Sequence, residues 1–222
     1  MKIVEFQVGD AVKVNEGVMC PDYEKYSLAG LQGFVTELFP EAGTLDIYWD
    51  EISLRALPSD YIRELILDGM GWDEMRLGLA EVSKASPRGN LKKAKTAYEI
   101  VAADHVWDHL SDNNPGIAEL LDPLGTRDVE ECLEAWQDHL EEKLKLPFEA
   151  EVEEFQERGS FRQGDVVQVD SLEDIDEYRG ILVNIRYKGR KYVFPLCDLE
   201  ATDKTSSNYQ PLNDYVVWFA NR

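Results

Sequence analysis

The chain has 222 residues, of which 44 are acidic and 23 are basic, so its formal net charge at pH 7 is −21. This charge repels phosphate groups at long range, which argues against a nucleic-acid partner or an anionic membrane surface. No apolar run approaches the length of about 20 residues that a membrane-spanning helix needs, and charged residues come too early for a signal peptide. Cations, basic proteins and neutral proteins remain as partners.

Three cysteines, Cys20, Cys132 and Cys197, lie far apart in the sequence. An odd number of cysteines without paired spacing fits a reducing cytoplasm better than a disulfide framework, so we expect a cytoplasmic protein. A zinc site shared by the three thiols would lack the usual C-x-x-C spacing. His105 and His109 offer another incomplete metal pair, four residues apart on a predicted helix and without a third ligand.

Residues 6–14 and 161–169 repeat one pattern, F-x-x-G-D-x-V-x-V. The Gly-Asp pair predicts a turn, and the alternating valines that follow predict a strand with one buried face. In each copy a second strand is expected to begin at Gly33 or Gly180, and a later glycine marks the turn before a third strand. Small β modules with this turn chemistry resemble SH3-like barrels. The sequence therefore predicts an α+β chain with an internal repeat, in which a helical segment separates two small SH3-like barrels.

We expect three domains along the chain. An N-terminal SH3-like barrel covers residues 1–63, a helical linker bundle covers residues 64–125, and an acidic helix plus a second barrel covers residues 126–222. Apolar residues recur at helical spacing in three stretches of the linker: residues 72–84, 91–110 and 117–121.

Residues 128–145 predict an acidic amphipathic helix that precedes the second barrel. Asp128 stands at the N-cap position with Glu131 three residues later, which is close to a capping box. Residues 148–153 then alternate strictly between apolar and glutamate side chains. This alternation predicts a strand that turns Phe148, Ala150 and Val152 toward a core and its glutamates outward.

Residues 170–177 carry five carboxylates in eight positions: Asp170, Glu173, Asp174, Asp176 and Glu177. Serine and aspartate favour a loop here, and the crowded carboxylates repel one another in water. A cation among the oxygens relieves this repulsion, and Ca²⁺ is the hard cation that accepts six to eight oxygen ligands. A solvated acidic surface without a ligand is the open alternative. The loop is not an EF-hand, because Ile181 stands where that loop carries its bidentate glutamate.

Residues 128–222 resemble the cyanobacterial calcium-binding protein family of CcbP-like proteins. Five blocks in the same order carry the resemblance: residues 146–152, 164–169, 178–183, 194–200 and 214–219. The resemblance implies a helix before an SH3-like barrel, and Ca²⁺ held by surface carboxylates rather than by a dedicated loop. Carried over residue by residue, it implies the ligands Asp170, Glu173, Asp174, Asp176 and Glu177, with Asp198, Glu200 and Asp203 approaching from the next segment.

The expected function is that of an acidic, non-enzymatic calcium-binding protein, a buffer or low-affinity sensor. No nucleotide-binding or nucleophile motif is found in the sequence, so we expect no enzyme activity. The alternative is a protein–protein interaction module, in which the paired barrels recognise a basic or proline-containing segment of another protein. The aromatic residues that would build its groove are Tyr23, Tyr26, Tyr48 and Trp49.

Overall fold

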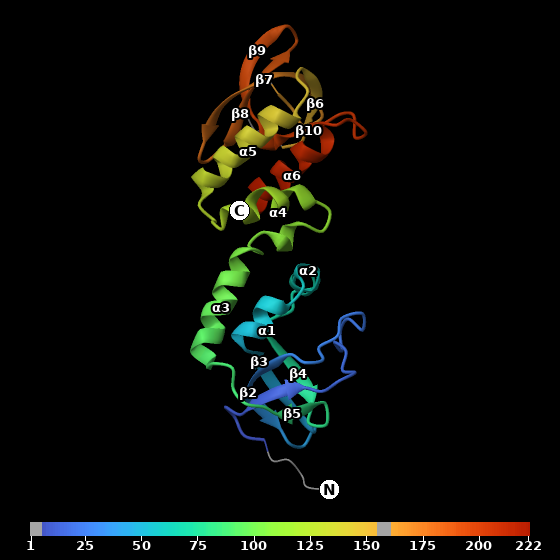
Figure 1. Ribbon diagram of the computed structural model, residues 1–222. Helices are drawn as coiled ribbons and strands as arrows, with labels where there is room; N and C mark the ends of the chain where they lie inside the picture. The colour runs from blue at the N-terminus through green and yellow to red at the C-terminus, as the bar shows by residue number, and fades with distance from the viewer. Residues whose placement is uncertain (1–5, 155–160) are drawn as a thin grey trace. The chain divides into compact units, whose positions relative to one another are not determined.

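A computed structural model describes residues 6–154 and 161–222 of the chain (Figure 1). The chain divides into two compact units, Met1–His105 and Val106–Arg222, so the segment 64–125 is shared between them. Each unit contains helices and one five-stranded antiparallel sheet, which confirms the α+β class. Closure of either sheet into an SH3-like barrel stays a prediction. In the described part of the chain, no helix combines the length and apolar character needed to cross a membrane.

The sheet of the first unit has the strand order β4-β3-β2-β1-β5. Its strands are β1 (Ala11–Val14), β2 (Gln32–Phe39), β3 (Thr44–Trp49), β4 (Glu74–Gly78) and β5 (Val82–Lys84). The first three strands are consecutive and antiparallel, as the motif and its glycine turns predict. Their buried faces form one hydrophobic core with the helices of this unit.

The helix predicted over residues 72–84 is wrong, because this stretch forms β4 and β5. Met75 and Leu77 are buried while their neighbours Glu74 and Arg76 are exposed, which is the alternation of a strand. β4 pairs along its whole length with β3. The apolar spacing fitted a helix as well, and pairing with a strand distant in the sequence decided between the two.

The helices of the first unit are α1 (Glu51–Ala56), α2 (Ser59–Leu67) and α3 (Leu91–Ala103). Because α3 ends at Ala103, the helix predicted over residues 91–110 is shorter than expected. His105 lies beyond its end, and His109 belongs to the separate 3₁₀ helix η1 (Asp108–Leu110). The two histidines therefore do not share one helical face.

The sheet of the second unit has the strand order β10-β6-β7-β8-β9. Its strands are β6 (Phe148–Val152), β7 (Val166–Asp176), β8 (Gly180–Tyr187), β9 (Arg190–Pro195) and β10 (Leu199–Ala201). The alternation predicted for residues 148–153 is confirmed, since Ala150 and Val152 are buried in β6 and Glu149 is exposed. β7, β8 and β9 form the second antiparallel meander.

The loop predicted for residues 170–177 is wrong, because β7 runs through Asp176 and stays paired with β8. The pairing shifts twice, between Val169 and Ser171 and between Leu172 and Asp174. Such bulges set two residues opposite one and reset the in–out alternation of the strand. Hydrophobic side chains three residues apart, at positions 169, 172 and 175, can therefore all contact the core.

Helices α5 (Val129–Lys143) and α6 (Tyr209–Asn221) cover the core of the second unit, together with α4 (Pro115–Leu121) and η3 (Leu196–Asp198). The short 3₁₀ helix η2 (Asp122–Leu124) follows α4 and buries no residue. Asp128 caps α5 as predicted, because its carboxylate accepts hydrogen bonds from the backbone N–H groups of residues 130 and 131. Trp136 of α5 is fully buried against Tyr215 and Trp218 of α6. The ring centroids of these three residues are 5.8 to 6.2 Å apart.

Both copies of the F-x-x-G-D motif form the same turn. The N–H of Asp10 donates to the carbonyl of Gln7 at 3.0 Å, and the N–H of Asp165 donates to the carbonyl of Arg162 at 3.0 Å. Each aspartate carboxylate also accepts a hydrogen bond from the backbone N–H three residues before it. The turn predicted from the sequence is thus confirmed in both places, while descent of the two sheets from one repeat stays a prediction.

Candidate functional site

The acidic residues of the predicted loop 170–177 lie on the solvent-facing side of β7 and in the turn that follows it. Three pairs of positions, 170–171, 173–174 and 176–177, fall between or after the hydrophobic positions that contact the core. All six positions are half-buried or exposed. The two bulges therefore leave four carboxylates on the outer side of an ordered strand, and a fifth, Glu177, follows in the turn. We call these five residues the acidic strip (Asp170, Glu173, Asp174, Asp176 and Glu177).

Two residues of β8 already bind carboxylates of the acidic strip. The guanidinium Nη2 of Arg186 lies 2.9 Å from Oδ2 of Asp170. The side-chain amide of Asn184 donates to the carboxylate of Glu173 and, at 3.1 Å, to the hydroxyl of Ser171. Asn184 and Arg186 were not among the residues predicted from the sequence. The signal for them was the alternation along β8, which turns these two side chains toward solvent beside β7.

Asp176 closes the turn between β7 and β8. Its Oδ1 accepts hydrogen bonds from the backbone N–H groups of Tyr178 and Arg179, both at 2.9 Å. The guanidinium of Arg179 adds an ion pair at 3.2 Å. The backbone N–H of Arg179, aided by the other donors, lowers the pKa of the Asp176 carboxyl. This carboxylate therefore stays ionised while it stabilises its own turn.

Glu177 lines a groove of about 550 Å³ together with the first turns of α5. Asp128, Glu130 and Glu134 of that segment also line the groove, so negative charge gathers around it. The Asp128 carboxylate is engaged in capping α5, and the positive end of the helix disfavours a cation at that point. Arg127 lies among the lining residues as well and offsets part of the charge.

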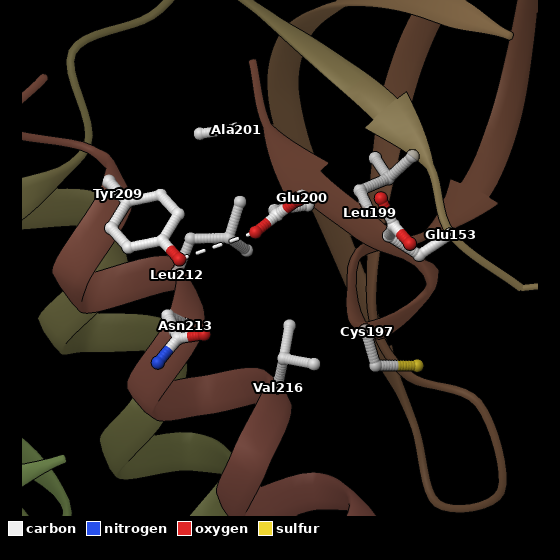
Figure 2. Close-up of a pocket in the computed structure, with 9 residues that line it drawn as sticks. All are labelled: Glu153, Cys197, Leu199, Glu200, Ala201, Tyr209, Leu212, Asn213 and Val216. Atoms are coloured by element: carbon white, nitrogen blue, oxygen red, sulfur yellow. Dashed lines mark hydrogen bonds between the residues drawn. The ribbon is translucent and has the colours of Figure 1, made fainter. Parts of the chain in front are cut away.

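Glu200 lies apart from the acidic strip, on β10, at a pocket of about 180 Å³ beside α6 (Figure 2). Its carboxylate pairs with Lys204 at 2.8 Å and accepts a hydrogen bond from the Tyr209 hydroxyl at 3.3 Å. The hydrogen bond from Lys204 lowers the pKa of Glu200. The pocket is lined by Glu153, Cys197, Leu199, Glu200, Ala201, Tyr209, Leu212, Asn213 and Val216.

Glu153 lines this pocket beside Glu200. From the sequence, Glu153 was expected on an outer strand face and was not among the predicted ligands. Partial desolvation raises the pKa of Glu153, and the neighbouring carboxylate of Glu200 raises it further. Asp203 is turned toward Thr205, whose backbone N–H and hydroxyl donate to it at 2.9 and 2.7 Å. Asp198 lies in η3, where its Oδ1 is 3.5 Å from the Cys197 thiol.

The eight predicted ligands therefore do not form one ready-made metal site. Across residues 6–154 and 161–222, no group of three or more His, Cys, Asp or Glu side chains is arranged to hold a metal ion. Five of the eight lie on the acidic strip, and the other three lie on η3, β10 and the segment after it. A cation shared by several of these carboxylates would need side chains to move from their present partners.

The aromatic groove of the alternative interaction function is not formed as predicted. Trp49 is fully buried and Tyr48 is nearly so, and both belong to the core of the first unit. The hydroxyls of Tyr23 and Tyr26 donate to Asp68 and Asp60 of the α2 region. These hydrogen bonds fix both rings against α2.

Comparison with known proteins identifies similarity in the second unit. Residues 125–219 match the model of the CcbP family, which is described as calcium binding. The crystal structure of Anabaena CcbP is 24% identical, with a TM-score of 0.36, and the match covers 43% of this chain and 79% of that one. A second structure, of a calcium binding protein in the calcium-binding form, is 19% identical, with a TM-score of 0.37 and coverages of 54% and 90%. No curated protein matches the chain.

The family match lies entirely inside the unit Val106–Arg222. It spans the capped helix α5, all five strands of the second sheet and nearly all of α6. The resemblance predicted for residues 128–222 is confirmed: residues 125–219 of this chain carry the sequence pattern of the CcbP-like calcium-binding family.

Proposed function

We propose that this protein binds calcium ions through surface carboxylates of its second unit, as a buffer or low-affinity sensor and not as an enzyme. The observation that carries the proposal is the match of residues 125–219 to a calcium-binding family. The charge of the unit supports it, since residues 106–222 contain 26 acidic and 12 basic side chains. Such an excess of negative charge raises the local concentration of divalent cations.

The proposed ligands are drawn from the acidic strip and from the segment that follows β9. Carboxylates on a solvent-facing strand are accessible to an ion, and Asp and Glu oxygens are the ligands that Ca²⁺ prefers. Because several of them are bound to other side chains, we expect modest affinity and a rearrangement on binding. The proposed set is Asp170, Glu173, Asp174, Asp176, Glu177, Asp198, Glu200 and Asp203.

Two further properties belong to this proposal. The cysteines Cys20, Cys132 and Cys197 are all free thiols, which supports a reducing, cytoplasmic location. We also propose that the second sheet, whose edge strands are β10 and β9, curls into an SH3-like barrel.

Isothermal titration calorimetry of the full chain with Ca²⁺, and with Mg²⁺ as a comparison, tests the proposal. The triple variant D170N/D174N/D176N removes three negative charges from the acidic strip and should weaken calcium binding at least tenfold. The variant D138N/E141Q/E142Q removes the same charge from exposed positions of α5 that do not line the groove at Glu177 and should weaken it much less. Absence of calcium binding by the full chain, or equal losses in the two variants, would exclude this site.

A further inference from the structure

Three carboxylates of the proposed calcium set already have a positively charged partner in the chain itself. Asp170 pairs with Arg186 at 2.9 Å, Asp176 with Arg179 at 3.2 Å, and Glu200 with Lys204 at 2.8 Å. The pair across the sheet is the best shielded of the three, because the side chain of Asp170 is only 19% exposed and that of Arg186 is 49% exposed.

The position of Arg186 makes it a direct competitor for calcium at Asp170. Arg186 is paired in register with Gln168, so it reaches Asp170 diagonally across the sheet on the solvent-facing side. A guanidinium donor and a metal ion both require the lone pairs of the carboxylate oxygens. A dication that approached Asp170 would also be repelled by the charge of Arg186 at close range.

We propose that Arg186 sets the calcium affinity of the acidic strip by acting as its resident counter-cation, so that calcium binding releases Arg186 from Asp170. This inference rests on the proposed function. The observation that carries it is the ion pair at 2.9 Å between Arg186 and the most shielded of the three paired carboxylates, Asp170. Binding is then an exchange of one cation for another.

The substitution R186Q tests the proposal, and the chain offers a matched control. Lys191 lies directly opposite Arg186 on β9, is exposed, and makes no ion pair with any described residue. K191Q therefore removes the same charge from the same surface without removing an ion pair. From the usual strength of exposed ion pairs, R186Q should raise calcium affinity about two- to fivefold more than K191Q does.

A second pair of variants shows whether the effect passes through Asp170. In the D170N background, R186Q should change calcium affinity no more than K191Q does, because the ion pair is already lost. Calorimetry of the full-length variants measures all of these affinities. In the unsubstituted protein, side-chain ¹⁵N NMR should show the Arg186 Nη signals moving toward the position of a solvated arginine as Ca²⁺ is added, because Nη2 is the atom that binds Asp170.

The possible results separate this inference from the proposed function. Calcium binding that strengthens equally in R186Q and K191Q, or that weakens in R186Q, would overturn the competitor role and leave calcium binding intact. An Arg186 signal that does not respond to saturating calcium would overturn it as well. Absence of calcium binding in the unsubstituted protein would refute both the proposed function and the competitor role of Arg186.

Discussion

Gly180 ends the turn that follows the acidic strip and lies against helix α6, so its replacement by alanine tests this packing. Gly180 has φ of +71° and ends the turn opposite Asp176. A Cβ there would meet the hydroxyl of Tyr215 and would come within 2.7 Å of the Phe219 ring. Both α6 side chains are buried, so neither can move away without cost.

A control for this substitution lies in the next turn of the same meander. Gly189 has φ of +79°, and a Cβ at that position would meet nothing within 4 Å. The left-handed conformation costs a non-glycine residue about 1–2 kcal/mol at either position. Overpacking in a filled core costs about 1–3 kcal/mol more, so G180A should destabilise the second unit by about 2–5 kcal/mol and G189A by about 1–2 kcal/mol.

Amide hydrogen exchange is the suitable assay, because the two units need not unfold together. The amide of Ile185, buried in the middle of β8, reports on opening of the second unit. Its exchange should accelerate by at least about fivefold more in G180A than in G189A, corresponding to the difference of about 1 kcal/mol or more. Equal acceleration in the two variants would mean that α6 does not pack against this turn as described.

Three further predictions concern buried and half-buried groups of the second unit. Y215F removes the oxygen that accepts the Ile181 N–H at 2.7 Å. It should lower the free energy of unfolding by about 1–3 kcal/mol, because a buried donor is left unpaired. Hydrogen exchange of the Ile181 amide should become faster, and unchanged protection of this amide would contradict the prediction. Burial raises the pKa of Asp214, so this group stabilises the fold at low pH, and the stabilisation is lost as the pH rises from the unfolded-state pKa through the folded-state pKa. D214N should remove this pH-dependent loss of stability. Urea unfolding at several pH values measures it, and the same dependence of stability on pH in D214N and the unsubstituted protein would contradict the prediction. Burial also raises the pKa of Cys197 to about 12. At pH 8 the Cys197 thiol should therefore react with a thiol reagent far more slowly in native protein than in unfolded protein. Rapid labelling of Cys197 in native protein would refute this prediction.

Local sequence patterns were sufficient where neighbouring residues decide the structure. The Gly-Asp turns at Asp10 and Asp165 follow from a short side chain that accepts a nearby backbone N–H. The start of α5 follows from the capping carboxylate of Asp128. The strand β6 follows from strict alternation of glutamate with apolar residues.

The acidic strip shows where local reasoning failed. From the sequence, repulsion among its five carboxylates and the presence of loop-forming residues favoured a loop. The structure instead forms a bulged strand there, because pairing with β8 and burial of residues 169, 172 and 175 outweigh the local preference. The predicted helix over residues 72–84 failed for the same reason, since its partner β3 is distant in the sequence.

The sequence by itself determined that this protein is strongly acidic, that its second half resembles a calcium-binding family, and which carboxylates are concentrated there. Only the tertiary structure decided which groups stand beside those carboxylates. Asp170 is separated from Arg186 by 16 positions, and Glu153 is separated from Glu200 by nearly fifty, yet each pair is in contact. Such contacts depend on strand register and on bulges, which long-range packing sets and which no local pattern encodes.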